Sequence, residues 1–210
     1  MIRYSEQYID HEDISKVVKT LKSDFITTGP KIPEFEKNLS KKINSKYSVA
    51  FNSATSALHS ACIALGLKKN DWLWTSANSF VASANCGLYC GAKVDFIDIE
   101  LETFNIDLQK LEIKLYKAKK KKLLPKIIIP IVFAGQSYDR DRLINLSKKY
   151  NFKILEDASH GLGSKYKNKY LGSHKKITTV FSFHPVKMIT TGEGGSAHTQ
   201  NKKYYEIMKS

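Results

Sequence analysis

Two residues in the second half of the chain have the types and surroundings that amine chemistry requires. Lys187 follows an apolar segment at 178–183 and has an apolar residue on each side. A lysine in partly apolar surroundings loses proton affinity and becomes a nucleophilic amine at neutral pH. Asp157 follows a second such segment at 152–155, where a carboxylate needs a cationic partner. The plainer interpretations are a lysine that reaches solvent and an aspartate that caps the next helix.

A third candidate is the hydroxyl-rich turn at 52–56, between a predicted strand and a predicted helix. Helix N-termini present unpaired N–H groups and a positive dipole end, so this turn could hold a phosphate, although Ser and Thr are also ordinary N-caps. The glycine patterns of dinucleotide-binding and P-loop sites do not occur in the sequence. Asp157, His160 and His184 lack the ligand spacing of a zinc or iron centre, so we expect no metal.

These candidates need a framework, and the hydrophobic pattern predicts one. Strands are expected at 47–51, 72–75, 93–97, 126–133, 152–155, 178–183 and 195–199. Helices are expected from an Asp10 cap to about 23, at 33–43, 54–65, 80–89, 108–118 and 140–149, and after Asn201. This alternation predicts an α/β fold with a mostly parallel sheet covered on both faces. Ligands of such sheets bind beyond the carboxyl ends of the strands, where all three candidates lie.

Taken together, the three strand ends match what pyridoxal phosphate requires. Lys187 would form the Schiff base, and Asp157 would keep the ring nitrogen protonated. The helix that begins after the strand at 47–51 would hold the phosphate, and Phe80 could stack on the ring. This combination is more specific than any of its parts.

Composition excludes several other classes of protein. The 210 residues are 42% hydrophobic with 11 Gly and 5 Pro, which excludes a disordered or collagen-like chain. The net charge of +14 (34 basic minus 20 acidic) comes mostly from lysines spread along the chain, which favours a solvated surface over a nucleic-acid partner. The apolar run at 127–134 is too short for a membrane span of about 20 residues, and the N-terminus lacks a signal-peptide pattern. We therefore expect a cytoplasmic protein without membrane contact.

Five segments of the chain resemble DegT/StrS-type nucleotide-sugar aminotransferases, which are fold-type-I pyridoxal-phosphate enzymes. The segments are Thr27-Thr28-Gly29-Pro30-Lys31, Ser53-Ala54-Thr55-Ser56-Ala57-Leu58-His59, Asn78-Ser79-Phe80-Val81-Ala82, Glu156-Asp157-Ala158-Ser159-His160 and Phe181-Ser182-Phe183-His184-Pro185-Val186-Lys187. Within the family, segments 84–92, 133–136 and 184–187 are most similar to the pseudaminic-acid branch. The resemblance covers essentially the whole chain and implies a large pyridoxal-phosphate domain.

The resemblance also implies a role for each site residue. Lys187 would carry the Schiff base and move the proton between substrate and cofactor, Asp157 would pair with the pyridinium nitrogen, and His160 would lie near the ring hydroxyl. The phosphate would be held by Ser53, Ala54, Thr55 and Ser182, and Phe80 would stack on the ring. Tyr4 and the segment Asp24, Phe25, Ile26 and Thr27 would approach the sugar nucleotide.

The implied reaction is transamination from glutamate to a UDP-linked 4-keto-6-deoxy sugar of pseudaminic acid biosynthesis, carried out by a homodimer of the full-length form. Family members continue into a small C-terminal domain, so we expect an N-terminal fragment in which residues 1–30 form a helix and substrate-side segment and residues 31–210 an incomplete large domain. Two alternatives stay open. One is another keto sugar nucleotide, of the perosamine or bacillosamine type, and the other is a truncated, catalytically inert binding protein with this fold.

Overall fold

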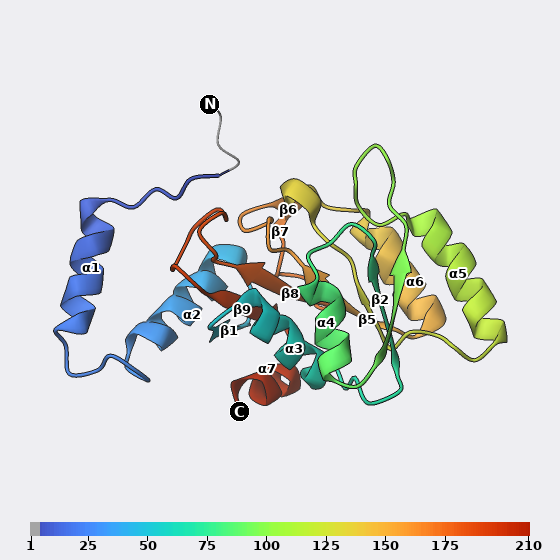
Figure 1. Ribbon diagram of the computed structural model, residues 1–210, viewed down its shortest axis with the longest axis horizontal. Helices are drawn as coiled ribbons and strands as arrows, with labels where there is room; N and C mark the ends of the chain where they lie inside the picture. The colour runs from blue at the N-terminus through green and yellow to red at the C-terminus, as the bar shows by residue number, and fades with distance from the viewer. Residues whose placement is uncertain (1–4) are drawn as a thin grey trace.

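The computed structural model describes residues 5–210, which fold around one seven-stranded sheet (Figure 1). The strands are β1 (Tyr47–Phe51), β2 (Trp72–Ser76), β3 (Lys93–Ile97), β4 (Ile127–Ile129), β5 (Lys153–Asp157), β8 (Ile177–Ser182) and β9 (Gly195–Thr199), in the order β1-β9-β8-β5-β4-β2-β3. All neighbours from β3 to β8 are parallel, whereas β9 is antiparallel to both β8 and β1. The predicted mostly parallel sheet is therefore confirmed. A short hairpin, β6 (Lys165–Tyr166) and β7 (Lys169–Tyr170), was not expected.

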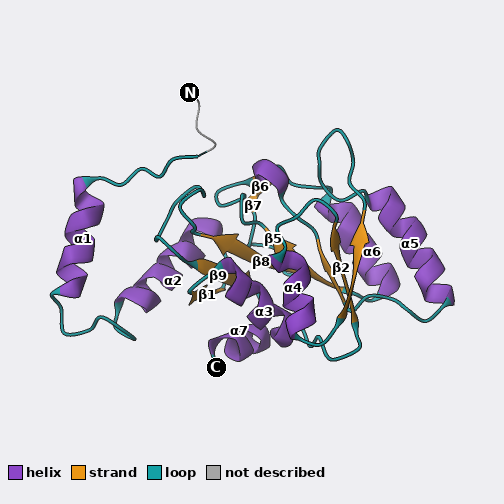
Figure 2. Cartoon of the chain, viewed as in Figure 1, coloured by secondary structure: helices purple, strands orange, loops and turns teal. Residues whose placement is uncertain are grey.

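Helices cover both faces of the sheet (Figure 2). One face carries α2 (Lys31–Ile43), α5 (Leu108–Lys120) and α6 (Arg140–Tyr150), whose buried side chains form one apolar core with the sheet. The opposite face carries α3 (Ala54–Ala64), α4 (Ala82–Tyr89) and α7 (Lys202–Lys209), which form the second core. The strands contribute to both cores because successive side chains point to opposite faces.

The first helix, α1 (His11–Leu21), lies apart from the sheet (Figure 1). Asp10 caps it as predicted: its side chain accepts from the Asp13 backbone N–H, and the Asp13 carboxylate accepts from the Asp10 N–H. No residue of α1 is buried, and its apolar side chains, such as Ile14 and Leu21, are exposed. None of the helices in residues 5–210 has the length and apolar character that a membrane crossing requires.

The central strand β4 is shorter than the predicted 126–133. Pro130 has no N–H, so the ladder stops at Ile129. The neighbouring strand β5 continues beside it, because the Asp157 N–H donates to Pro130 O (3.0 Å) and Asp157 O accepts from the Val132 N–H (2.9 Å). β5 therefore runs two residues past the predicted end at 155, and Asp157 is its last residue.

Candidate active site

A cavity of about 510 Å³ lies at the carboxyl edge of the sheet, within the range of about 300–1,000 Å³ typical of small-molecule sites. All eight residues predicted to bind the cofactor line it: Ser53, Ala54, Thr55, Phe80, Asp157, His160, Ser182 and Lys187. They come from parts of the chain up to 134 residues apart (187 minus 53). The lining also includes Ser159, His184, Glu193 and several apolar residues, for which the sequence analysis predicted no contact with the cofactor.

Two of these residues end adjacent parallel strands. Asp157 is the last residue of β5 and is 4% exposed, and Ser182 is the last residue of β8 and is also buried. Asp157 is paired with Val180, so the two strand ends are held in a fixed register. The Ser182 Oγ accepts from the His184 N–H at 3.4 Å, which leaves the hydroxyl hydrogen available to a ligand.

The start of α3 has the features of an anion site. Ser53 caps the helix, with its Oγ accepting from the Ser56 N–H at 3.1 Å. The N–H groups of Ala54 and Thr55 precede the first intrahelical donor, Ala57, and are therefore left for a ligand. The N-terminal end of the α3 helix dipole is positive, which favours the binding of a phosphate there.

The turn at Ser53 and Ala54 packs directly against the first residue of β9. A Cβ on Gly195 would lie only 2.3 Å from the Ala54 backbone N. Only glycine permits this approach, so the antiparallel strand β9 fixes the position of the anion site.

Lys187 lies in the return between β8 and β9, where its backbone N–H donates to His184 O at 2.9 Å. Its side chain is half-buried, and burial lowers the pKa of the amine, an effect that the Asp157 charge opposes. The pKa of the neighbouring His160 is lowered by burial and then by the Lys187 cation. Both groups therefore have a larger neutral, proton-accepting fraction near pH 7 than they would have in water.

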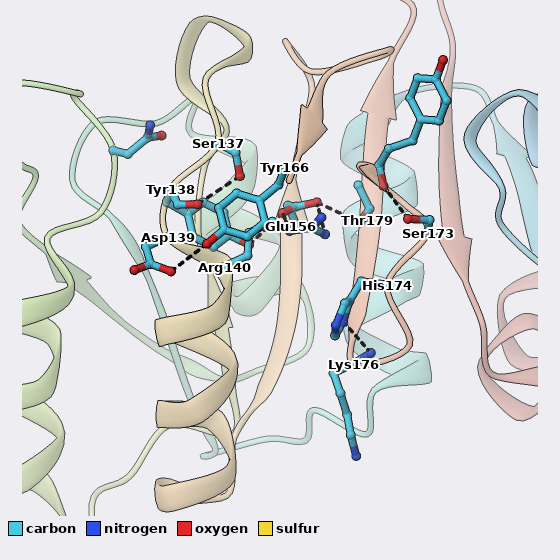
Figure 3. Close-up of polar contacts among 12 residues, drawn as sticks. Ser137, Tyr138, Asp139, Arg140, Glu156, Tyr166, Ser173, His174, Lys176 and Thr179 are labelled. Carbon is cyan, nitrogen blue, oxygen red and sulfur yellow. Dashed lines mark hydrogen bonds and ion pairs between the residues drawn. The ribbon is translucent and has the colours of Figure 1, made fainter. Parts of the chain in front are cut away.

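Side-chain alternation along β5 places Glu156 on the opposite face of the sheet from the cavity, among a set of buried polar groups (Figure 3). The Glu156 carboxylate accepts from Tyr138 Oη (2.7 Å), Thr179 Oγ1 (2.9 Å) and Arg140 (3.3 Å). Arg140 Nε also lies 3.1 Å from Glu156 Oε1, although its N–H makes no well-directed hydrogen bond. This buried ion pair anchors the strand end that presents Asp157.

The predicted substrate segment is not part of this cavity. None of the residues 24–27 lines it, and Phe25 and Ile26 are 59% and 72% exposed between α1 and α2. Tyr4 lies outside the described residues. Phe80 lines the cavity but is 74% exposed, so much of its ring faces solvent.

Ser83 and Ser159 are site residues that the sequence reasoning missed. Ser159 donates to Asp157 Oδ1 from both its Oγ (2.6 Å) and its N–H (3.1 Å), and Ser83 donates to Asp157 Oδ2 at 2.5 Å. The sequence pattern around Ser83 could have indicated its role. Ser83 is a lone hydroxyl among small apolar residues on the buried face of a helix, and a buried hydroxyl needs a hydrogen-bond partner.

The donor set fits pyridoxal phosphate. The α3 start and Ser182 suit its phosphate, the Asp157 carboxylate suits its protonated ring nitrogen, and the Lys187 amine suits its aldehyde. A phosphate-type anion site, a buried carboxylate and a depressed-pKa lysine in one cavity of an α/β fold define the large domain of a fold-type-I enzyme.

The chain belongs to the DegT/DnrJ/EryC1/StrS aminotransferase family, whose sequence pattern matches residues 7–210. The family expected from the sequence motifs is therefore confirmed.

Particular relatives give finer comparisons. A UDP-4-amino-4,6-dideoxy-N-acetyl-beta-L-altrosamine transaminase of Campylobacter jejuni is 46% identical over 209 residues, which is 100% of this chain and 54% of that protein. A UDP-4-amino-4-deoxy-L-arabinose–oxoglutarate aminotransferase of Shewanella sediminis is 35% identical over 92% of this chain and 48% of its own. The structure of Helicobacter pylori PseC, an aminotransferase of pseudaminic acid biosynthesis, aligns with a TM-score of 0.88 at 35% identity over 99% of this chain and 54% of that chain. The chain thus spans about half the length of the relatives it matches.

Proposed function

We propose that this chain carries the cofactor site of a pyridoxal-phosphate-dependent aminotransferase that moves an amino group from glutamate to a UDP-linked 4-keto-6-deoxy sugar. The observation that carries the proposal is the convergence of Lys187, Asp157 and the α3 start on one cavity. Such a set has no evident use in a protein that only packs a core. It also argues against the inert alternative, because the groups expected to hold the cofactor all line the cavity.

The residues of the cavity have distinct tasks in this proposal. When bound, the cofactor supplies an electron sink for the carbon that carries the amine. The Asp157 carboxylate holds the ring nitrogen in its protonated form, and the first turn of α3 with Ser182 holds the phosphate. Lys187 Nζ holds the cofactor and then accepts and returns a proton at the substrate carbon, a task that suits an amine whose pKa is lowered by burial.

The sugar substrate is inferred from the relatives. The Campylobacter jejuni relative is named as an altrosamine transaminase and is 46% identical over the whole chain, and the Helicobacter pylori protein, named for pseudaminic acid biosynthesis, is 35% identical over 99% of it. The Shewanella sediminis relative acts on a different UDP sugar and matches at 35%. The higher identity of the first favours the pseudaminic acid sugar over other keto sugars.

The cofactor assignment is tested by absorption and by chemical trapping. The chain incubated with pyridoxal phosphate should show visible absorption that Lys187→Ala abolishes, while Lys110→Ala, on the exposed part of α5, should leave it unchanged. After borohydride reduction, peptide mapping should find the pyridoxyl group on Lys187. A pyridoxyl group on any other lysine would overturn the site.

The substrate assignment needs a separate assay. The protein with glutamate is offered the 4-keto precursors of the altrosamine, bacillosamine, perosamine and aminoarabinose nucleotides in turn, and amine formation is followed by mass spectrometry. The proposal expects the altrosamine precursor to react at least about tenfold faster, which corresponds to ~1.4 kcal/mol of transition-state discrimination. Equal rates on all four would contradict it.

We also propose that the protein acts as a homodimer. The apolar side chains exposed on α1 and around Phe80, Val81, Leu88 and Tyr89 support this proposal, since a monomer would leave them in water. Light scattering after size exclusion should give twice the mass of 23.8 kDa. A monomer at micromolar concentration would contradict it.

A further inference from the structure

The Asp157 carboxylate is satisfied by hydroxyl and backbone donors instead of by a protein cation. Its Oδ1 accepts from the Ser159 N–H and Oγ, and its Oδ2 accepts from Ser83 Oγ at 2.5 Å. Among residues 5–210, none of the ion pairs involves Asp157. Three donors fill part of the hydrogen-bonding capacity of the carboxylate, and the remaining acceptor positions are left for a group in the cavity.

Ser83 is held in place by the packing of α4. It is the second residue of that helix and is completely buried. Its N–H donates to Phe80 O at 3.1 Å, and its carbonyl accepts from Cys86 Sγ at 3.4 Å. One turn further, a Cβ on Gly87 would lie 3.2 Å from side chains of β2 and β3, so α4 sits close on the sheet. The Ser83 hydroxyl is therefore a fixed donor, and its only hydrogen-bond partner in the described part of the chain is Asp157.

We propose that Ser83, supported by Ser159, is a positioning residue that fixes the Asp157 carboxylate in the orientation that receives the cofactor's ring nitrogen. This inference rests on the proposed function of the cavity. Ser159 holds one carboxylate oxygen from the strand's own loop, whereas Ser83 holds the other from α4, so the carboxyl plane cannot rotate. Phe80 lies two residues before α4, and its carbonyl accepts from the Ser83 N–H, so the start of this helix positions both the residue expected to stack on the ring and the donor that orients Asp157.

A purely structural role for Ser83 predicts a different result from a positioning role. If the hydroxyl only fills space, its loss would change stability but not the state of a bound ring. If it orients Asp157, its loss would let the carboxylate turn, and the ring N–H would lose its acceptor. The ¹⁵N chemical shift of the labelled ring nitrogen reports this directly, since it distinguishes the protonated from the neutral ring.

The experiment compares the unaltered chain with Ser83→Ala, Ser83→Thr and Ser159→Ala, each loaded with ¹⁵N-labelled pyridoxal phosphate. Ser76→Ala is the matched control, because Ser76 is equally buried but its Oγ makes no hydrogen bond. We expect Ser83→Ala to weaken cofactor binding about tenfold and to move the ¹⁵N signal toward the neutral-ring value. Ser83→Thr should restore both, Ser159→Ala should give a smaller change in the same direction, and Ser76→Ala should change neither.

The outcomes separate this inference from the function on which it rests. If the unaltered chain binds the cofactor on Lys187 but Ser83→Ala leaves affinity within twofold and the ¹⁵N signal in place, the positioning role is wrong and the proposed function stands. If Ser83→Ala does not fold, Ser159→Ala decides, since that residue is only partly buried and contacts the same carboxylate. If the unaltered chain does not take the cofactor on Lys187, both the proposed function and this inference fail.

Discussion

The buried ion pair behind the cavity permits a quantitative test. Arg140 and Glu156 are 3% and 0% exposed, and Glu156 has two neutral donors besides the arginine, at 2.7 and 2.9 Å. Arg140→Met removes the guanidinium that pairs with the Glu156 carboxylate, while it keeps an apolar side chain of similar length. Breaking such a pair leaves an uncompensated buried charge, so we expect a loss of about 3–5 kcal/mol in the free energy of unfolding. That is a large share of the ~5–15 kcal/mol by which a typical domain is stable.

The assay is urea unfolding followed by circular dichroism, with the midpoint and slope compared among three variants. Arg142→Met is the matched control, because Arg142 lies on the same helix but its pair with Glu112, at 3.8 Å, is exposed; its loss should cost less than ~1 kcal/mol. The double variant Arg140→Met with Glu156→Gln should recover most of the loss, since the glutamine amide is neutral and can still bond Tyr138. A loss below ~1 kcal/mol for Arg140→Met alone would show that Glu156 does not carry a buried charge.

Three further predictions concern other parts of the fold. His198 is buried, and its pKa falls to about 3 from the unfolded value of 6.5. The free energy of unfolding should therefore be unaffected by His198 above pH 6.5 and should fall as the pH drops toward 3, by about 2 kcal/mol at pH 5. Urea unfolding at a series of pH values measures this loss. Gly195→Ala should push the Ala54 turn out of place and weaken pyridoxal phosphate binding about tenfold in a fluorescence titration. Lys187, whose pKa is lowered by burial, should react with an amine-labelling reagent at pH 8 before Lys110, whose pKa is raised by its hydrogen bond to Asp98.

Each of these predictions has a result that would contradict it. A His198→Asn variant that loses as much stability between pH 7.5 and pH 5 as the unaltered chain would show that another group titrates. Unchanged affinity in Gly195→Ala would mean that the turn adapts without moving its N–H groups. Equal labelling of Lys187 and Lys110 would show that water in the cavity solvates the Lys187 amine too well for burial to lower its pKa.

The sequence predicted most of the strands well, because strands depend on local pattern, and the residues that it proposed for the cofactor all line one cavity. Three strands begin and end at the residues that the hydrophobic pattern and the turn residues predicted: Tyr47–Phe51, Lys93–Ile97 and Gly195–Thr199. β4 was predicted too long because the apolar run continues through Pro130, whose missing N–H ends the ladder.

Other features depended on contacts between distant residues. The bond from Ser83 to Asp157 joins residues 74 apart, and no local pattern specifies which carboxylate a buried serine meets. The same holds for Arg140, which was expected only as the first residue of a helix but pairs with Glu156 across the packing of α6 on β5. The segment at 24–27 was assigned by resemblance alone, and nothing in its spacing could place it relative to the cavity.

The reversed strand β9 has a consequence for how the cavity forms during folding. It completes the sheet between β8 and β1, and the buried contact of Ser48 with His198 closes a loop of 150 residues. Contacts this far apart are formed slowly, because the chain entropy of closure is lost before the contact is gained. Until β9 inserts, the edge of β1 is unpaired and the Ser53 turn has no Gly195 beneath it. On the ribosome, the cofactor site therefore assembles only after residue 195 has emerged, and shorter nascent chains have no complete place to bind the cofactor.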